Sequence, residues 1–388
     1  MDAREQDSRR ITLLSTVSVG EQAAADAIST QLPDDEGGFT VLFGTTQYDL
    51  GLLGRALRSA GHYRVVGAAT SRAIGPAGFL KEGVTGFHLP SGRFKVADAL
   101  IEDVGTFGLP DARQVVQSLL RRLHEGTQPR QPHLFAMLLV DAEPRCEERL
   151  VAALATELGG VPLVGGSAGD VYFNPSGQNT TAARVLHQGR AVRAGAVFCI
   201  VASQDPVLAL SHHNFVAGRR RLVVTDADPD RRLVHEIDGR SALKVYAAAC
   251  GLKSVPKDAR AFSSYPLMIK AGGQYFARGM QRIYEGGSIE FACAIEPGLV
   301  VRVAQPEDML ERLTQTFGGL NKALGVPELV IGFDCAARTA YMERHDLTEA
   351  VSGVFAKQQV IGFSTLGEQF NTIHVNNSLT CLGIAAAK

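Results

Sequence analysis

Three stretches of the chain repeat one pattern, and this repetition limits the folds that the chain can adopt. Each stretch begins with an apolar run typical of a buried strand, continues with a helical segment and closes with a second apolar strand. The closing strands, at residues 63–71, 161–170 and 360–368, each contain an apolar pair, a glycine and then mainly small or hydroxyl residues. Units of this kind form sheets covered by helices, so we expect an α/β fold with mixed sheets.

Between the second and third units the pattern changes. Residues 182–186, 191–202, 207–214 and 221–225 are rich in β-forming side chains, which predicts antiparallel strands. A charged connector containing proline follows at residues 226–232, and we place a domain boundary there. The chain is therefore expected to have two parts, residues 1–230 and 231–388. In the second part we expect helices at residues 242–250 and 307–324, and a hairpin at residues 275–294 that turns at 285–287.

Composition excludes several classes of protein. The chain is 45% hydrophobic and 20% charged, values typical of a folded globular protein. Its length of 388 residues allows two or three domains. The formal net charge of -1 gives no reason to expect nucleic acid as a partner. The first ten residues lack the apolar core of a signal peptide, and apolar runs such as residues 194–202 are too short to span a membrane. We expect a cytoplasmic protein without a membrane partner.

Common cofactor and scaffold motifs are missing from the sequence. The six cysteines lie far apart and form no Cys-x-x-Cys pair, so neither a zinc finger nor a disulfide scaffold is indicated. No Gly-x-x-x-x-Gly-Lys loop or Gly-x-Gly-x-x-Gly fingerprint is present, so a nucleotide cofactor is not indicated either.

The last of the three closing strands ends in an unusual concentration of polar residues. Glu368, Gln369, His374 and Asn376 surround a turn between two strands, and Asp170 follows the second closing strand. A sheet can hold such a turn rigidly while exposing its side chains, which suits ligand capture. The alternative is a hairpin with ordinary turn polarity.

A serine at the second closing strand fits the Gly-x-Ser-x-Gly motif of hydrolases. Ser167 follows an apolar strand, but that motif needs a helix directly after the serine. Residues 173–177 contain proline and glycine and resist helix formation. A hydrolase that uses Ser167 is one alternative function, and it predicts ester turnover that is lost in Ser167→Ala. We nevertheless expect that the protein is not an enzyme.

Two adjacent histidines end a predicted strand. His212 and His213 must point to opposite faces of that strand, so the two rings do not easily serve one site. Imidazole is a suitable axial ligand for haem iron, and His374 is a further candidate. The alternative for each is a polar residue at a strand end.

Several motifs, taken in order, resemble the FIST sensory family. They lie at residues 65–86, 165–170, 224–246, 332–338 and 367–376 and cover nearly the whole chain. The resemblance implies a ligand-sensing module. Stand-alone members include nitric oxide sensing proteins, which bind b-type haem and regulate a partner histidine kinase, and the forms at residues 211–214 and 334–335 are similar to that subgroup. Residues 69–73 depart from the Ala-Gly-Glu type of turn that many relatives have.

Two alternative ligands are expected, the first from the resemblance and the second from the carboxylates at the polar turn. In the first interpretation the protein binds haem b without a covalent bond, responds to nitric oxide and regulates a histidine kinase. His212 or His213 would ligate the iron, with His374 as a further haem contact and Arg338 as a partner of a propionate. In the alternative, a small polar metabolite such as an amino acid binds Asp170, Glu368, Gln369 and Asn376, with Arg338 near its carboxylate. The oligomeric state is left open, a homo-oligomer included.

Overall fold

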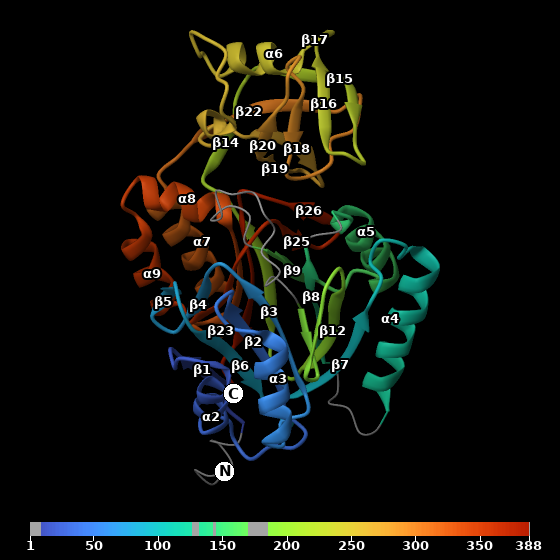
Figure 1. Ribbon diagram of the computed structural model, residues 1–388, viewed down its shortest axis with the longest axis vertical. Helices are drawn as coiled ribbons and strands as arrows, with labels where there is room; N and C mark the ends of the chain where they lie inside the picture. The colour runs from blue at the N-terminus through green and yellow to red at the C-terminus, as the bar shows by residue number, and fades with distance from the viewer. Residues whose placement is uncertain (1–8, 126–131, 143–144, 170–184, 388) are drawn as a thin grey trace.

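A computed structural model describes residues 9–125, 132–142, 145–169 and 185–387, and it has the expected mixed α/β architecture (Figure 1). The described strands form four sheets. Sheets 1 to 3, with their helices, make up what we term the body. Sheet 4 lies at one end of the body. No helix in the described ranges is long and apolar enough to cross a membrane.

The three sheets of the body share one plan, which confirms the repeated units. The centre of each sheet is a parallel pair of strands joined by one or two helices. In sheet 1 the pair is β2 (Phe39–Thr45) and β3 (Val65–Thr70), joined by α3 (Leu50–Ser59). In sheet 2 it is β8 (His133–Asp141) and β9 (Leu163–Ala168), joined by α5 (Glu147–Leu158). In sheet 3 it is β23 (Pro327–Cys335) and β24 (Val360–Thr365), joined by α8 (Ala336–Arg344) and α9 (Thr348–Lys357).

Each unit also gives a hairpin to the sheet of another unit. The next described hairpin after each closing strand pairs with a strand of another sheet. The hairpin that follows β3 joins sheet 3, the hairpin that follows β9 joins sheet 1, and the hairpin that follows β24 joins sheet 2. These hairpins are β4 (Ala73–Gly75) with β5 (Gly78–Leu80), β10 (Val185–His187) with β11 (Arg190–Val192), and β25 (Glu368–Phe370) with β26 (Ile373–Val375). The exchange links the three units into one interlocked body.

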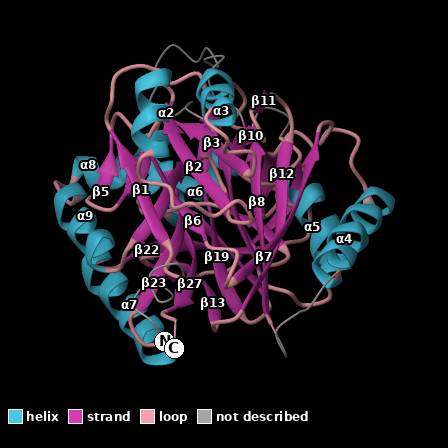
Figure 2. Ribbon diagram, turned by 90° about the horizontal axis from the view of Figure 1, so that it is seen from below, coloured by secondary structure: helices cyan, strands magenta, loops and turns pink. Residues whose placement is uncertain are grey.

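The remaining strands complete the sheets and the helices cover them. Sheet 1 adds β1 (Thr12–Thr16) and β6 (Val84–Leu89), sheet 2 adds β7 (Phe94–Ile101) and β12 (Ala196–Ser203), and sheet 3 adds β13 (Val207–His212) and β27 (Leu379–Ala385). The inner faces of all three sheets meet in one apolar core, where Phe43 of sheet 1 packs on Phe363 of sheet 3 with ring centroids 5.1 Å apart. The outer faces pack on separate helix groups: α2 (Glu21–Ser29) with α3, α4 (Leu109–His124) with α5, and α7 (Met309–Leu324) with α9 (Figure 2).

The glycine in each closing strand has a structural cause. Gly67, Gly165 and Gly362 lie opposite Leu42, Leu138 and Gly332 of the neighbouring parallel strand. A Cβ atom at any of these glycines would overlap the carbonyl oxygen of that opposite residue. The repeated glycine therefore allows the two central strands of each sheet to approach, and it needs no ligand to explain it.

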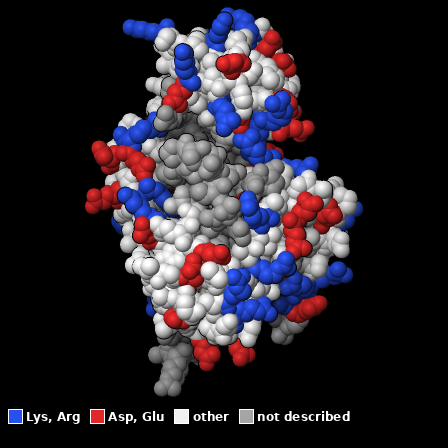
Figure 3. All heavy atoms as spheres, in the orientation of Figure 1, with Lys and Arg blue, Asp and Glu red and all other residues white. Residues whose placement is uncertain are grey.

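Sheet 4 is inserted between β13 and α7 and has an apolar core of its own. It comprises β14 (Phe215–Ala217), β15 (Leu222–Asp228), β16 (Leu233–Ile237), β17 (Arg240–Ser241), β18 (Leu267–Ala271), β19 (Gln274–Arg278), β20 (Met280–Ile283), β21 (Ile289–Phe291) and β22 (Val300–Pro306), with α6 (Ala242–Ala249) and the 3-10 helix η1 (Ala259–Phe262) packed beside them. The connector at which we expect the boundary, residues 226–232, contains the turn between β15 and β16, and these two strands pair with each other. Acidic and basic side chains both occur on sheet 4 and on the body in the face shown in Figure 3.

Candidate functional site

The β25–β26 hairpin brings the polar corner of the third unit onto the closing strand of the second. Gln369 donates a hydrogen bond from Nε2 to Ser167 Oγ, at 2.9 Å, and the same nitrogen lies 3.4 Å from Nδ1 of His374. All three side chains are buried. Ser167 thus contacts an amide rather than a base, which gives it none of the activation that a hydrolase serine needs.

Glu368 lies completely inside the protein. The hydroxyl groups of Thr365 and Ser378 donate hydrogen bonds to its two carboxylate oxygens, the latter at 2.6 Å. Burial is the main cause that raises the pKa of Glu368 to about 8, against the opposing effect of these hydrogen bonds. The carboxyl group is mostly protonated at neutral pH, so it is poorly suited to bind an ammonium group there.

Asn376 connects the body to sheet 4. Its Oδ1 accepts a hydrogen bond from the backbone N–H of Gly279 at 2.7 Å, and its Nδ2 donates to Sγ of Cys293 at 2.7 Å. Asp170, the other predicted acid, lies outside the described residues. The predicted ligand-binding residues Glu368, Gln369 and Asn376 are therefore close together in the chain's fold, but each is at most 1% exposed.

The adjacent histidines lie in different surroundings. His212 Nδ1 is 2.9 Å from the hydroxyl of Thr316 on α7, while its buried Nε2 has no hydrogen-bond partner among the described residues. Burial, and next the charge of Arg338, hold the pKa of His212 well below its ordinary value, so the ring is neutral. His213 faces sheet 4 instead. Its Nε2 donates to the carbonyl of Tyr275 at 2.9 Å, and its Nδ1 accepts from the backbone of Phe215 at 3.3 Å.

Arg338 is held inside the body by an ion pair. Its Nε donates to Oδ1 of Asp334 at 2.6 Å, and the two side chains are 2% and 0% exposed. Desolvation raises the pKa of Asp334, and Arg338 opposes that shift. Its buried Nη2 has no hydrogen-bond partner among the described residues, so a propionate or a carboxylate would have to reach that nitrogen inside the body.

A cavity of about 370 Å³ lies between sheet 4 and the body, and we term it the cleft. One wall comes from η1 and the β19–β20 turn, and the other from α8 and the end of the β26 segment. Its lining residues are Ala259, Phe262, Ser263, Gly279, Met280, Gln281, Ala337, Ala340, Glu343, Arg344 and Asn377. The volume lies within the range of small-molecule sites.

Two charged residues of α8 line the cleft, and the sequence did not indicate them. Arg344 Nη2 donates to the hydroxyl of Ser263 at 2.8 Å across the cleft. Glu343 forms an ion pair with Arg72, and its side chain stays 39% exposed. The lining of the cleft thus combines a guanidinium, a carboxylate and two amides with apolar side chains. The residues opposite α8 come from about 60 to 80 positions earlier in the chain, so no local motif marks the site.

The three predicted haem-ligating histidines lie outside the linings of two cavities formed by the described residues. None of the three candidate histidines lines the cleft, and none lines the second cavity, of about 470 Å³, between β7 and α4. Both ring nitrogens of His213 already have protein partners. His212 and His374 each keep a buried Nε2 without a hydrogen-bond partner among the described residues, and the Nδ1 of His212 is fixed by Thr316 at 2.9 Å.

Comparison with known families decides the classification. The FIST N domain matches residues 38–240, and the FIST C domain matches residues 242–371. The chain belongs to the FIST family. FIST domains are sensory signalling domains, which fits the expectation that this protein is not an enzyme. The two FIST matches meet at β17, about ten residues after the boundary expected from the connector.

Comparisons with curated proteins and with solved structures give no evidence about the function of this FIST protein. No curated protein matches the chain. Among solved structures, one similar chain is described as "Cyanuric acid hydrolase: evolutionary innovation by structural concatenation". It is 9% identical, the match covers 97% of this chain and 99% of that chain, and the TM-score is 0.34. A likeness at this level carries no argument about function.

Proposed function

We propose that this FIST protein is a ligand sensor whose ligand is a small zwitterion, such as an amino acid, bound in the cleft. The observation that supports the proposal is that a guanidinium, Arg344, and a carboxylate, Glu343, both line a cavity of suitable size. The guanidinium would bind a carboxylate through paired hydrogen bonds, and the carboxylate of Glu343 would bind an ammonium group. Phe262 and Met280 would contact the apolar part of the ligand.

The position of the cleft suggests how binding would be signalled. A ligand between η1 and α8 contacts sheet 4 and the body at once, so it favours the arrangement in which both walls are in place. Asn377 in the cleft adjoins Asn376, which already joins the two parts through Gly279. A partner protein that distinguishes the two arrangements would read the signal, and we propose a histidine kinase for this role.

A thermal-shift screen with the common L-amino acids tests the proposal. We expect one chemical class to raise the melting temperature in a saturable way, because a ligand that binds only the folded state stabilises it. Arg344→Gln should weaken the binding of that ligand by at least about tenfold, because a charged hydrogen bond contributes about 1.5–3 kcal/mol. Arg312→Gln on α7, whose arginine pairs with Glu307 outside the cleft, should bind like the wild type. Equal binding by Arg344→Gln and the wild type would refute the site.

Haem with a nitric oxide response is the second candidate, and the unpartnered Nε2 of His212 favours it. Bound haem would supply an iron centre for nitric oxide, and His212 would hold that iron with its ring fixed by Thr316. The measurement is the absorption spectrum after haem reconstitution. A saturable one-to-one Soret band that shifts with nitric oxide, and that is lost in His212→Ala but kept in His213→Ala, would establish this candidate. Weak binding without saturation, or an unchanged band in His212→Ala, would exclude His212 as the ligand.

A further inference from the structure

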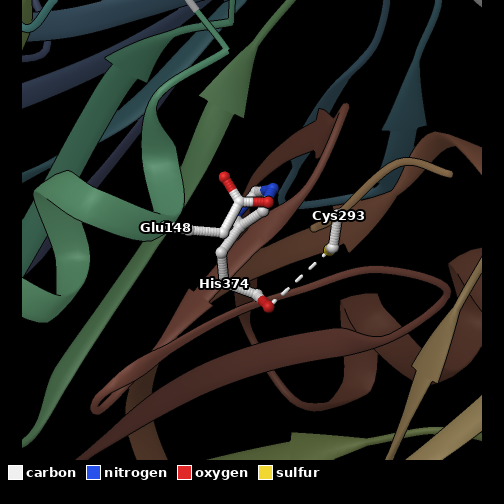
Figure 4. A group of neighbouring side chains, drawn as sticks. All are labelled: Glu148, Cys293 and His374. Atoms are coloured by element: carbon white, nitrogen blue, oxygen red, sulfur yellow. Dashed lines mark hydrogen bonds between the residues drawn. The ribbon is translucent and has the colours of Figure 1, made fainter. Parts of the chain in front are cut away.

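Three side chains from distant parts of the chain meet where α5, sheet 4 and the β25–β26 hairpin come together (Figure 4). Glu148 lies in the first turn of α5, Cys293 follows β21, and His374 lies in β26. One ligand atom from each residue lies within 4.8 Å of the other two. The site is separate from the residues that line the cleft, and the sequence showed none of the spacings that usually mark a metal site.

We propose that Glu148, Cys293 and His374 bind a divalent transition-metal ion, with Zn²⁺ as the ion that suits them best. A thiolate, an imidazole nitrogen and a carboxylate oxygen are the three ligand types that Zn²⁺ uses in proteins. Tetrahedral Zn²⁺ needs donor atoms about 3.5 Å apart, so small side-chain rotations would close the observed spacing. Cys293 and His374 are buried, whereas the Glu148 side chain is 30% exposed, which leaves a side for water as fourth ligand.

The surrounding hydrogen bonds are those that would hold metal ligands in place. Asn376 Nδ2 donates to Sγ of Cys293 at 2.7 Å, which stabilises a thiolate. The backbone N–H of Ala294 donates to Oε1 of Glu148 at 2.7 Å. His374 packs on Gly367, where a Cβ atom would overlap the ring, and its buried Nε2 has no hydrogen-bond partner in the described part of the chain. The cluster therefore holds a buried ring nitrogen that a metal would satisfy.

The charges around the cluster offset the ion in part, and the pocket holds one net positive charge once M²⁺ has bound and Cys293 has lost its proton. Arg232 donates to Glu147 at 2.6 Å and to Oε2 of Glu148 at 2.8 Å, and Arg278 also lies near Cys293. Two carboxylates and two guanidinium groups leave the pocket neutral while Cys293 is a thiol. When M²⁺ binds, the S–H bond breaks, an M–S bond forms and the proton passes to solvent, so one proton is released per ion bound.

Titration of the metal-free protein with Co²⁺ tests the site, because Co²⁺ gives a thiolate-to-metal absorption band in the near ultraviolet. We expect the full-length protein to bind one equivalent of Co²⁺ with this band, to release about one proton per ion, and to exchange the Co²⁺ for Zn²⁺. The band should disappear in Cys293→Ser and persist in Cys250→Ser, which changes a half-buried cysteine at the end of α6, outside the cluster.

Glu148→Gln keeps the test decisive if Cys293→Ser does not fold, because this side chain is partly exposed and the band itself comes from Cys293. Its affinity for Co²⁺ should fall about tenfold or more. Absence of stoichiometric binding by the wild type, or a band that is unchanged in a folded Cys293→Ser protein, would overturn the proposal. Unchanged affinity in Glu148→Gln would remove Glu148 from the ligand set.

Discussion

The Gly362→Ala variant is expected to lose about 3 kcal/mol or more of its unfolding free energy. Gly362 lies opposite Gly332 in the central parallel pair of sheet 3, and an added Cβ would overlap the carbonyl oxygen of Gly332. Backbone atoms at this place belong to two buried strands, so neither strand can move aside without disturbing the core. Equilibrium unfolding in urea measures the loss, and a variant recovered only as aggregate agrees with it.

A matched control separates this overlap from the general effect of changing a glycine. Gly353 lies in α9, and an added Cβ there would meet no atom within 4 Å. Gly353→Ala should therefore be neutral or stabilised by about 0.5–1 kcal/mol, since alanine is the better helix former. If Gly362→Ala were as stable as Gly353→Ala, the close-approach explanation of the repeated glycines would be wrong.

The second large effect concerns the pH dependence of stability. The pKa of Glu368 is about 8 in the folded protein, whereas an exposed glutamate has about 4.5. Between these values the folded state holds a proton that the unfolded state has lost, so stability falls as pH rises. The contribution is fully present below about pH 4.5 and is lost progressively up to about pH 8, at about 1.4 kcal/mol per pH unit, or roughly 5 kcal/mol at most.

Glu368→Gln should remove this part of the pH dependence, because the amide is neutral throughout. Urea unfolding at several pH values between about 5 and 8 would show the wild type losing stability relative to the variant as pH rises. Glu349→Gln changes an exposed carboxylate of α9 and should leave the slope of the wild type. Parallel profiles for wild type and Glu368→Gln would mean that Glu368 is ionised in the folded protein at neutral pH.

Much of the body could be predicted from local patterns. Apolar runs and helical periodicity predicted the parallel pairs, because both features are set by burial within a single unit. The exchange of hairpins could not be predicted. Strands β4, β10 and β25 pair with strands of other units, and the sequence of such a short strand does not identify the strand with which it pairs. Helix α8 was not predicted either, because its nine residues are too few to show a clear helical periodicity.

The polar corner shows the corresponding limits for the site. The sequence singled out Glu368, Gln369 and Asn376 as ligand-binding residues, and the fold gathers them but also buries them in hydrogen bonds of their own. Glu343 and Arg344 were missed because on the sequence they are ordinary charges at the end of a helix. The role that we propose for them depends on Ser263 and Gly279 across the cleft, a juxtaposition that only the tertiary structure provides.

Hydrogen–deuterium exchange most directly tests the central claim that the ligand lies between sheet 4 and the body. The protein would be compared with and without the amino acid that raises its melting temperature most. We predict slower exchange in segments 259–263, 279–281 and 337–344 together, because these segments line both walls of the cleft. Protection confined to one wall, or to elements outside the cleft such as β7 and α4, would contradict the claim.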